Sequence, residues 1–296
     1  MLAFFVVCLH LHILRDSYPL LSYVLVNGLF RMGVPVFLII SGYFFFYVND
    51  LSRLKKWSFR IFFLYAIWSV IYIPLWKEND EYSMNILFGY HHLWYLIGTL
   101  FAGLFLYMLR NIPAKKLFFV LIACFCCGYT IQYLGNSHYF KGETDVLLNL
   151  FPVYRNFLFV CFPFLGIGFL IKRQGIEVRR RPPLWLVLLA AGSVMAESLL
   201  NEQLLHLQKK ESVDLLFSLL IACPVLFLYC KNITVKTDSK ILASISTAIY
   251  LIHPLVMEWV YQSTYLTSFH DVVFVGVLLA ASLILVFLNR KLKYIL

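Results

Sequence analysis

The chain is short of charge, and of acidic charge most of all. Only 14% of its 296 residues are charged, whereas 61% are hydrophobic, and it has 25 Lys and Arg against 15 Asp and Glu. Soluble domains carry about 25% charged residues, and the mean hydropathy of this chain is +0.81. The composition excludes an ordinary soluble domain and indicates an integral membrane protein.

The chain also lacks patterns that hold metals, disulfide frameworks or nucleotides. Three of its seven cysteines, Cys124, Cys126 and Cys127, crowd one apolar segment and cannot surround a metal tetrahedrally. Its 14 glycines are scattered and form no phosphate-binding loop. The sequence therefore predicts no metal site and no bound cofactor.

Ten apolar segments have lengths near the roughly 20 residues that a bilayer-spanning helix needs. No internal repeat and no long linker divides them. We therefore expect an all-α fold, a polytopic transmembrane helical bundle of about ten helices, forming a single domain over residues 1–296. The predicted spans are residues 1–14, 32–48, 61–76, 93–109, 117–134, 155–171, 184–200, 213–230, 241–262 and 272–289.

The basic residues give the expected orientation. With the N-terminus inside, most Lys and Arg fall in the inner loops, as the positive-inside rule requires. Of the acidic residues, only Asp50, Glu177 and Asp238 lie there. Both termini are thus predicted to be cytoplasmic. The net charge of +10 follows from topology and gives no reason to expect a nucleic-acid partner.

The first predicted span is short. About 14 apolar residues before Arg15 cannot cross roughly 30 Å at 1.5 Å per residue. A basic leader and a small-residue cleavage site are missing, so a signal peptide fits poorly. We expect Met1 to lie inside a first helix that is truncated, and a short, tilted or re-entrant first helix remains open.

Three phrases place polar or helix-breaking residues inside apolar segments. They are Arg31-Met-Gly-Val-Pro-Val-Phe-Leu-Ile-Ile-Ser-Gly-Tyr43, His92-Leu-Trp-Tyr-Leu96 and Ile249-Tyr-Leu-Ile-His-Pro254. Hydrocarbon cannot satisfy such groups, so they are expected to face a protein interior or a water-filled cavity. The phrases predict chemistry or transport.

These phrases, with Ala3-Phe-Phe-Val-Val-Cys-Leu-His10, resemble the signatures of acyltransferase family 3, bacterial integral membrane acyltransferases. The resemblance runs in order across essentially the whole chain. It implies transfer of an acyl group, most often acetyl, from cytoplasmic acyl-coenzyme A to a hydroxyl. Acetyl-CoA is then a co-substrate, and the expected location is the bacterial inner membrane.

Two departures from the family pattern touch the cytoplasmic side. The family's first helix has an arginine roughly ten residues before its histidine, a position that precedes Met1 here. The family often carries Arg-x-x-Arg at the start of its third helix. Arg60 matches the second position, Trp57 stands at the first, and Lys56 lies on the same helical face as Arg60. The resemblance implies that Arg60 and Lys56 bind the donor, whose phosphates suit guanidinium groups; the positive-inside rule alone also explains them.

Two histidines are the candidate catalytic residues. Acyl transfer to a hydroxyl needs a base, and the pKa of histidine lies near neutrality. His10 is the preferred base, the alternative being an interfacial histidine satisfied by water. His253 is the second candidate, because Pro254 removes a backbone hydrogen bond beside it. A purely structural role for His253, holding a helix kink, stays open.

Arg31 and Tyr43 are the candidate substrate-binding residues. Arg31 is expected near the outer interface, where it can hold anionic groups of the acceptor or extend to lipid headgroups. The Tyr43 hydroxyl can donate a hydrogen bond into a cavity. Arg155-Asn156-Phe157 is similar to another family phrase, without an assigned role.

The predicted function is a membrane O-acyltransferase. Its partners are acyl-CoA, membrane lipids and an acceptor hydroxyl on a cell-surface carbohydrate or its lipid-linked precursor. Two alternatives stay open. One is a transporter or flippase for a lipid-linked sugar, in which the same polar residues line a translocation path. The other is an inactive truncated remnant.

Overall fold

A computed structural model describes residues 2–15, 17–76, 82–178, 181–205, 213–233, 239–262, 270–292 and 295–296. Every regular element in these residues is helical, which confirms the all-α prediction. The α-helices are α1 (Leu2–Leu11), α2 (Pro19–Val26), α3 (Gly33–Phe45), α4 (Leu51–Trp76), α5 (Tyr82–Met84), α6 (Trp94–Leu109), α7 (Ala114–Asn136), α8 (Glu143–Leu148), α9 (Phe151–Tyr154), α10 (Phe162–Arg173), α11 (Leu184–Leu205), α12 (Leu219–Lys231), α13 (Ser239–Gln262) and α14 (His270–Asn289). Tighter or wider turns occur at η1 (Leu29–Met32), η2 (Asn85–Gly89), η3 (His91–Leu93), η4 (Phe157–Cys161) and η5 (Ile176–Val178).

Within the described residues, 8 helical stretches are long and apolar enough to cross a membrane. Helices α1 and α12 are apolar but shorter. The prediction of a polytopic helical bundle is therefore confirmed. The first predicted span contains α1, which ends at Leu11, and the chain turns at His12 with φ of 47°.

Two helical stretches begin earlier than the sequence analysis placed them. The span predicted at 32–48 belongs to a stretch from Pro19 to Phe45 that joins α2, η1 and α3. Helix α4 begins at Leu51 and not at residue 61. The predicted spans begin directly after Arg31 and Arg60, but a helix satisfies its own backbone hydrogen bonds and continues through polar residues at the interface.

The α-helices α10 and α12 themselves begin later than the spans predicted at 155–171 and 213–230, although a helical stretch from Phe151 to Arg173 contains the whole of the first span. In both cases side chains bind the backbone before the α-helix. The Asn156 side-chain oxygen Oδ1 accepts hydrogen bonds from Leu158 N at 2.9 Å and Phe159 N at 3.0 Å, within the turn that leads into α10. Before α12, the Glu197 carboxylate accepts the N–H groups of Phe217 and Ser218, both at 2.7 Å. These contacts satisfy backbone donors that a longer helix would otherwise use.

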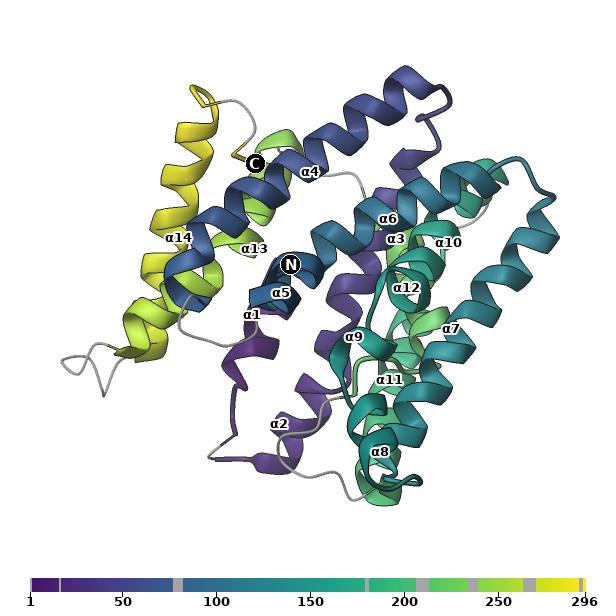
Figure 1. Cartoon of the computed structure of the whole chain (residues 1–296), viewed down its shortest axis with the longest axis horizontal. Coiled ribbons are helices and arrows are strands. Elements are labelled where there is room, and N and C mark those ends of the chain that lie inside the picture. Colours follow the sequence, from purple (N-terminus) through teal and green to yellow (C-terminus); the bar gives the residue numbers. More distant parts are fainter. Residues whose placement is uncertain are drawn as a thin grey trace.

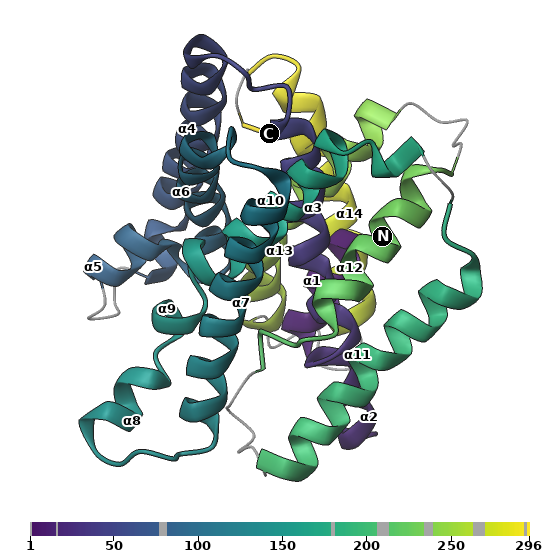
Figure 2. The same cartoon turned by 90° about the vertical axis from the view of Figure 1, so that its right-hand side faces the viewer.

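The bundle is built around the pair α3 and α10, which share the most extensive helix contact. Residues of α3, α6, α7, α10 and α12 form the main apolar core. Helices α13 and α14 pair along one edge of the molecule, and α7 lies toward the opposite edge (Figure 1). In the turned view, α11 lies on the outside of the bundle beside α12 (Figure 2). The arrangement leaves α1 between α3 and α13, which positions its last turn inside the bundle.

The crossing of α3 and α10 depends on two glycines. A Cβ atom on Gly42 would lie 1.8 Å from the carbonyl oxygen of Leu165, and one on Gly168 would lie 2.0 Å from that of Ile39. Small residues permit such close approach of two helix backbones in a membrane. No side chain can move to relieve these overlaps, because both partners are backbone atoms.

We therefore expect Gly42→Ala to separate α3 from α10 and to lower the free energy of unfolding by about 1–3 kcal/mol. The measurement is unfolding of the purified protein in mixed micelles with increasing denaturing detergent. Gly192→Ala in α11 is the matched control, because a Cβ there meets nothing within 4 Å. Equal stability of the two variants would contradict the close-packing argument.

A polar contact joins the end of α3 to the segment after α10. Glu177 is 9% exposed. Its carboxylate accepts hydrogen bonds from the Tyr43 hydroxyl at 3.1 Å and the Lys172 ammonium at 2.9 Å. Burial opposes ionisation of Glu177, but hydrogen bonds from Lys172, the backbone and Tyr43 outweigh it and hold the pKa of the carboxyl below its ordinary value.

This lowered pKa makes the contact pH-dependent. The unfolded carboxyl has a pKa of about 4.3, so Glu177 stabilises the fold fully above that pH and loses its effect as the pH falls through the lower folded pKa. Glu177→Gln is expected to cost about 2 kcal/mol at pH 7 and progressively less below pH 4. Detergent unfolding of the wild type and of Glu177→Gln, at pH 7 and at a pH below 4, measures how the cost of the substitution changes with pH. Glu143→Gln, at an exposed carboxylate, is the control. An equal cost at both pH values would contradict it.

Candidate functional site

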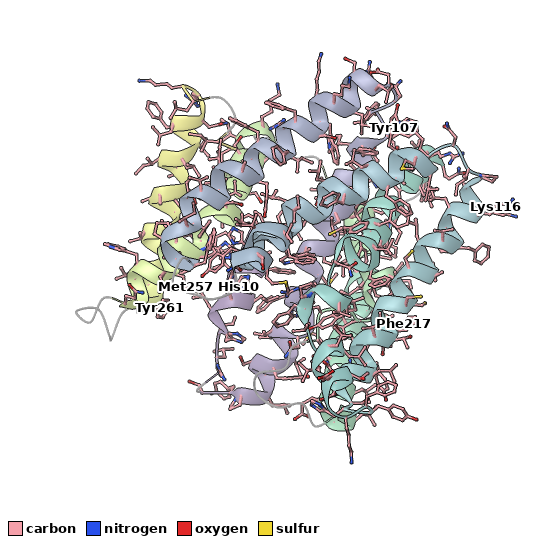
Figure 3. All side chains as sticks on the ribbon, viewed as in Figure 1. His10, Tyr107, Lys116, Phe217, Met257 and Tyr261 are labelled. Carbon is pink, nitrogen blue, oxygen red and sulfur yellow. The ribbon has the colours of Figure 1, made fainter. Side chains whose placement is uncertain are left out.

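Four histidines from three parts of the chain meet inside the bundle. They are His10 at the end of α1, His91 and His92 in η3, and His253 in α13. The ring centroid of His10 lies 4.5 Å from that of His91 and 5.2 Å from that of His253, and the His92 and His253 centroids are 5.1 Å apart. Figure 3 shows His10 near the centre of the molecule. The sequence analysis predicted His10 and His253 separately; the structure brings them together.

Pro254 fixes the orientation of His253. A proline has no N–H, so the carbonyl four residues earlier, that of Tyr250, loses its helical partner. His253 Nδ1 lies 2.8 Å from this carbonyl oxygen and 3.2 Å from that of Ile249. Because a carbonyl only accepts, Nδ1 must carry the proton, which leaves Nε2 of a neutral ring as an acceptor. Nε2 is buried and has no hydrogen bond to the described residues.

Two tyrosines pack against His92, and its neighbour His91 has an unusual backbone conformation. Tyr250 donates a hydrogen bond to the backbone carbonyl of His92, and its ring centroid lies 5.0 Å from that of His92. The Tyr72 ring also packs against His92, with 5.3 Å between the ring centroids, and the Tyr72 hydroxyl donates a hydrogen bond to Leu251 O at 2.7 Å. His91 has φ of 51°, a left-handed conformation that is costly outside glycine and is concentrated at functional sites.

Two cavities adjoin at His10. The smaller, about 60 Å³, is bordered by His10, Arg31, His92, Tyr250 and Asp214. The larger, about 1030 Å³, is open and is lined mainly by apolar and aromatic side chains from η2, α6 and the segment 149–157. His10, Trp94 and Arg155 border both cavities. The His10 ring is therefore accessible from both cavities.

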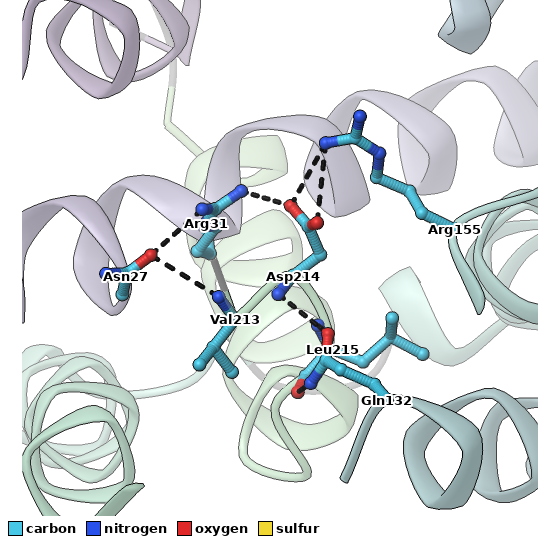
Figure 4. A network of polar contacts seen from close by, with 7 residues as sticks. All are labelled: Asn27, Arg31, Gln132, Arg155, Val213, Asp214 and Leu215. Carbon is cyan, nitrogen blue, oxygen red and sulfur yellow. Dashed lines mark hydrogen bonds and ion pairs between the residues drawn. The ribbon is translucent and has the colours of Figure 1, made fainter. Parts of the chain in front are cut away.

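A charged network forms the wall of the smaller cavity (Figure 4). Asp214 pairs with Arg31 and with Arg155 Nη1, the latter at 3.3 Å. The side chains of Arg31 and Asp214 are 9% and 8% exposed. Gln132 holds the backbone of this segment, because its carbonyl oxygen accepts the N–H groups of Asp214 at 2.8 Å and Leu215 at 2.9 Å.

The remaining predicted site residues lie elsewhere. Tyr43 borders neither cavity and contacts Glu177 and Lys172. Lys56 and Arg60 are exposed on the first half of α4 and also border neither cavity. Arg31, predicted near the outer interface, borders the smaller cavity and pairs with Asp214.

Three further residues at the site, His91, Asp214 and Arg155, have no role predicted from the sequence. Each of them has a feature visible in the sequence. His91 stands directly before His92 at the start of an apolar span, and Asp214 and Arg155 are charged residues at the ends of apolar segments. In the described part of the chain, no three His, Cys, Asp or Glu side chains are placed to hold a metal ion. The groups that the structure brings together at this site are histidine nitrogens, guanidinium groups and the walls of two cavities.

Comparison with known proteins shows the family to which the chain belongs. A family profile described as an acyltransferase domain matches residues 1–289. A protein of Enterococcus faecalis named amino-acid racemase is 29% identical over 289 residues, covering 87% of this chain and 40% of that protein. The chain thus spans less than half the length of this curated relative. No solved structure matches.

Proposed function

The chain belongs to the acyltransferase family, as a multi-pass membrane protein, and from this premise we propose that it is an O-acyltransferase. It moves an acyl group, acetyl in the first instance, from acyl-CoA to a hydroxyl of a cell-surface carbohydrate or its lipid-linked precursor. It does so in a bacterial inner membrane with both termini cytoplasmic.

The observation that carries the proposal is the position of His10. Its ring borders both cavities and is within 5.2 Å, centroid to centroid, of the His253 ring. A base must reach the hydroxyl proton directly or through one water, and a hydroxyl bound at the part of the larger cavity that His10 borders would satisfy this requirement. The histidines of α1, η3 and α13 lie together, which supports a catalytic role for His10 over the alternative of an isolated histidine at the interface.

The reaction then balances with this chain's own groups. The acceptor hydroxyl oxygen attacks the thioester carbonyl carbon, and His10 takes the hydroxyl proton. The carbon–sulfur bond breaks, and the coenzyme A sulfur leaves with the electron pair and receives the proton. A neutral His253, fixed by Nδ1 on Tyr250 O, leaves its buried Nε2 as an acceptor that can share that proton, with its ring centroid 5.2 Å from that of His10.

The donor is proposed to reach this site from the cytoplasmic side. Arg60 and Lys56 are exposed on α4 and are proposed to bind the phosphates of coenzyme A. Because neither residue borders a cavity, the long pantetheine arm must carry the thioester from that surface toward His10. Coenzyme A is thus bound at one place, by Arg60 and Lys56, and the acyl group is transferred at another, beside His10.

The acceptor is proposed to occupy the larger cavity. Its lining includes the aromatic side chains of Phe88, Trp94, Phe101, Phe151 and Phe157 together with a few polar groups. Mostly apolar walls with a few polar groups are typical of small-molecule sites, and aromatic faces suit the apolar faces of sugar rings. The racemase name belongs to a protein of which this chain covers 40%, and no racemisation is carried over here.

The experiment is label transfer. Membranes that contain the chain are incubated with acetyl-labelled coenzyme A and the surface glycans of the host. Alkali-labile label on the glycan supports O-acyl transfer. Movement of a lipid-linked sugar across the membrane without label favours the transporter. Absence of both, with the protein shown to be folded, favours the inactive remnant and overturns the proposal.

A further inference from the structure

The charged network carries more positive than negative charge. The guanidinium groups of Arg31 and Arg155 share one carboxylate, that of Asp214. Two positive charges and one negative charge leave +1 among these three side chains. A net charge next to a membrane interior is costly unless another charge or water compensates it.

The excess charge belongs to Arg155. Both terminal nitrogens of Arg31 have partners within the protein, because Nη1 pairs with Asp214 and Nη2 donates to Asn27 Oδ1 at 2.9 Å; its buried Nε has no hydrogen bond to the described residues. Asn27 Oδ1 in turn accepts Val213 N at 3.5 Å, which ties Arg31 to the segment that holds Asp214. Arg155 contacts Asp214 through Nη1 alone, at 3.3 and 3.4 Å, and its side chain is 23% exposed.

The free side of Arg155 has a suitable place for a ligand. Arg155 borders the larger cavity together with His10, and the described lining of that cavity contains no Asp, Glu or Lys. The guanidinium lies 5.2 Å from the ring centroid of Trp94 and 4.5 Å from that of Phe151. Contacts of this kind hold the planar group in place and leave its edge available for bidentate hydrogen bonding.

We propose that Arg155 binds a singly charged oxyanion of the acceptor, a carboxylate or a phosphodiester, in the larger cavity. The inference rests on the proposed function and narrows its acceptor to an anionic molecule. One negative charge matches the +1 of the network. Binding there places the acceptor's anionic group and its reacting hydroxyl in the cavity that His10 borders.

The test is equilibrium binding to the purified protein in detergent, without acyl-CoA, followed by tryptophan fluorescence. Two probes supply the oxyanions: glucuronate carries a carboxylate and glycerophosphoglycerol a phosphodiester. Glucose and glycerol are their neutral counterparts. We expect at least one anion to bind at least tenfold more tightly than its neutral counterpart. Arg155→Gln should remove this difference, Arg155→Lys should keep part of it, and Arg53→Gln, an exposed arginine in a surface ion pair, should keep all of it.

The outcomes show which kind of molecule supplies the oxyanion. Preference for glucuronate alone indicates an acidic sugar, preference for glycerophosphoglycerol alone indicates a phosphodiester-bearing precursor, and both support the oxyanion site. The proposal is overturned if the wild type binds the anions and their neutral counterparts equally well. It is also overturned if Arg155→Gln retains the tighter binding of the anion. The wild-type comparison needs no variant to fold. Since no acyl-CoA is present, a failure here leaves label transfer intact, and a failure of label transfer leaves this result standing.

Discussion

Replacing His10 with glutamine is expected to lower the rate of acyl transfer by about 10²–10⁴-fold, the range that removal of a positioned general base costs. Glutamine keeps a polar group of similar length but cannot accept the hydroxyl proton. His10 is the histidine that borders both cavities, so neither His91 nor His253 reaches the same set of bound groups. The measurement is the initial rate of label transfer from acetyl-labelled coenzyme A.

The matched control is His12→Gln. His12 follows α1 in a left-handed turn, with φ of 47°, and borders neither cavity. Its removal should leave the transfer rate within a factor of about two. If His12→Gln and His10→Gln lose activity equally, the effect lies in the turn after α1 and not in proton transfer.

His253 provides a second comparison. His253→Gln keeps a donor for the carbonyl of Tyr250 but removes the Nε2 acceptor, whereas His253→Ala removes both. If His10 is the base, His253→Gln should lose less activity than His10→Gln. The reverse order of losses would assign the base role to His253.

The sequence predicted the long helices well because a bilayer restricts helix length so strongly. A hydrocarbon core of about 30 Å needs about 20 apolar residues, and the segments predicted at 93–109 and 272–289 correspond closely to α6 and α14. The prediction was less accurate where helices extend beyond the hydrocarbon, as at the start of α4, or break inside it, as before α10. Side-chain contacts such as those of Asn156 decide these limits.

The site could be predicted only in part. Polar residues in apolar segments pointed to His10, His253 and Arg31, because burying a polar group in hydrocarbon requires a reason. The pairing of Arg31 with Asp214 joins positions 183 residues apart, and no local pattern specifies it. Tyr43 shares a helical stretch with Arg31, but about 1.5 Å per residue carries it roughly 18 Å along the axis, away from the histidines.

The second large effect is expected at Asp214. Asp214→Ala removes the only carboxylate in the described network and leaves Arg31, 9% exposed, and Arg155 without their shared partner. Breaking a buried ion pair by removing one partner costs about 3–5 kcal/mol, because the remaining charge is uncompensated. Detergent unfolding of the purified protein measures this loss. Arg53→Ala breaks an exposed pair with Asp50 and leaves Asp50 in place before α4, so it should cost at most about 1 kcal/mol.

A double substitution separates charge from packing. Asp214→Leu with Arg31→Leu removes one charge of each sign, so the net charge of the network returns to +1, carried by Arg155. If uncompensated charge causes the instability of Asp214→Leu, adding Arg31→Leu should recover part of the loss although it removes a second side chain. If the double variant is less stable than the single one, the network stabilises the fold through its hydrogen bonds to Asn27 and the segment at Val213, and charge balance is secondary. The first result would also leave Arg155 as the network's remaining cation, the condition on which anion binding in the larger cavity depends.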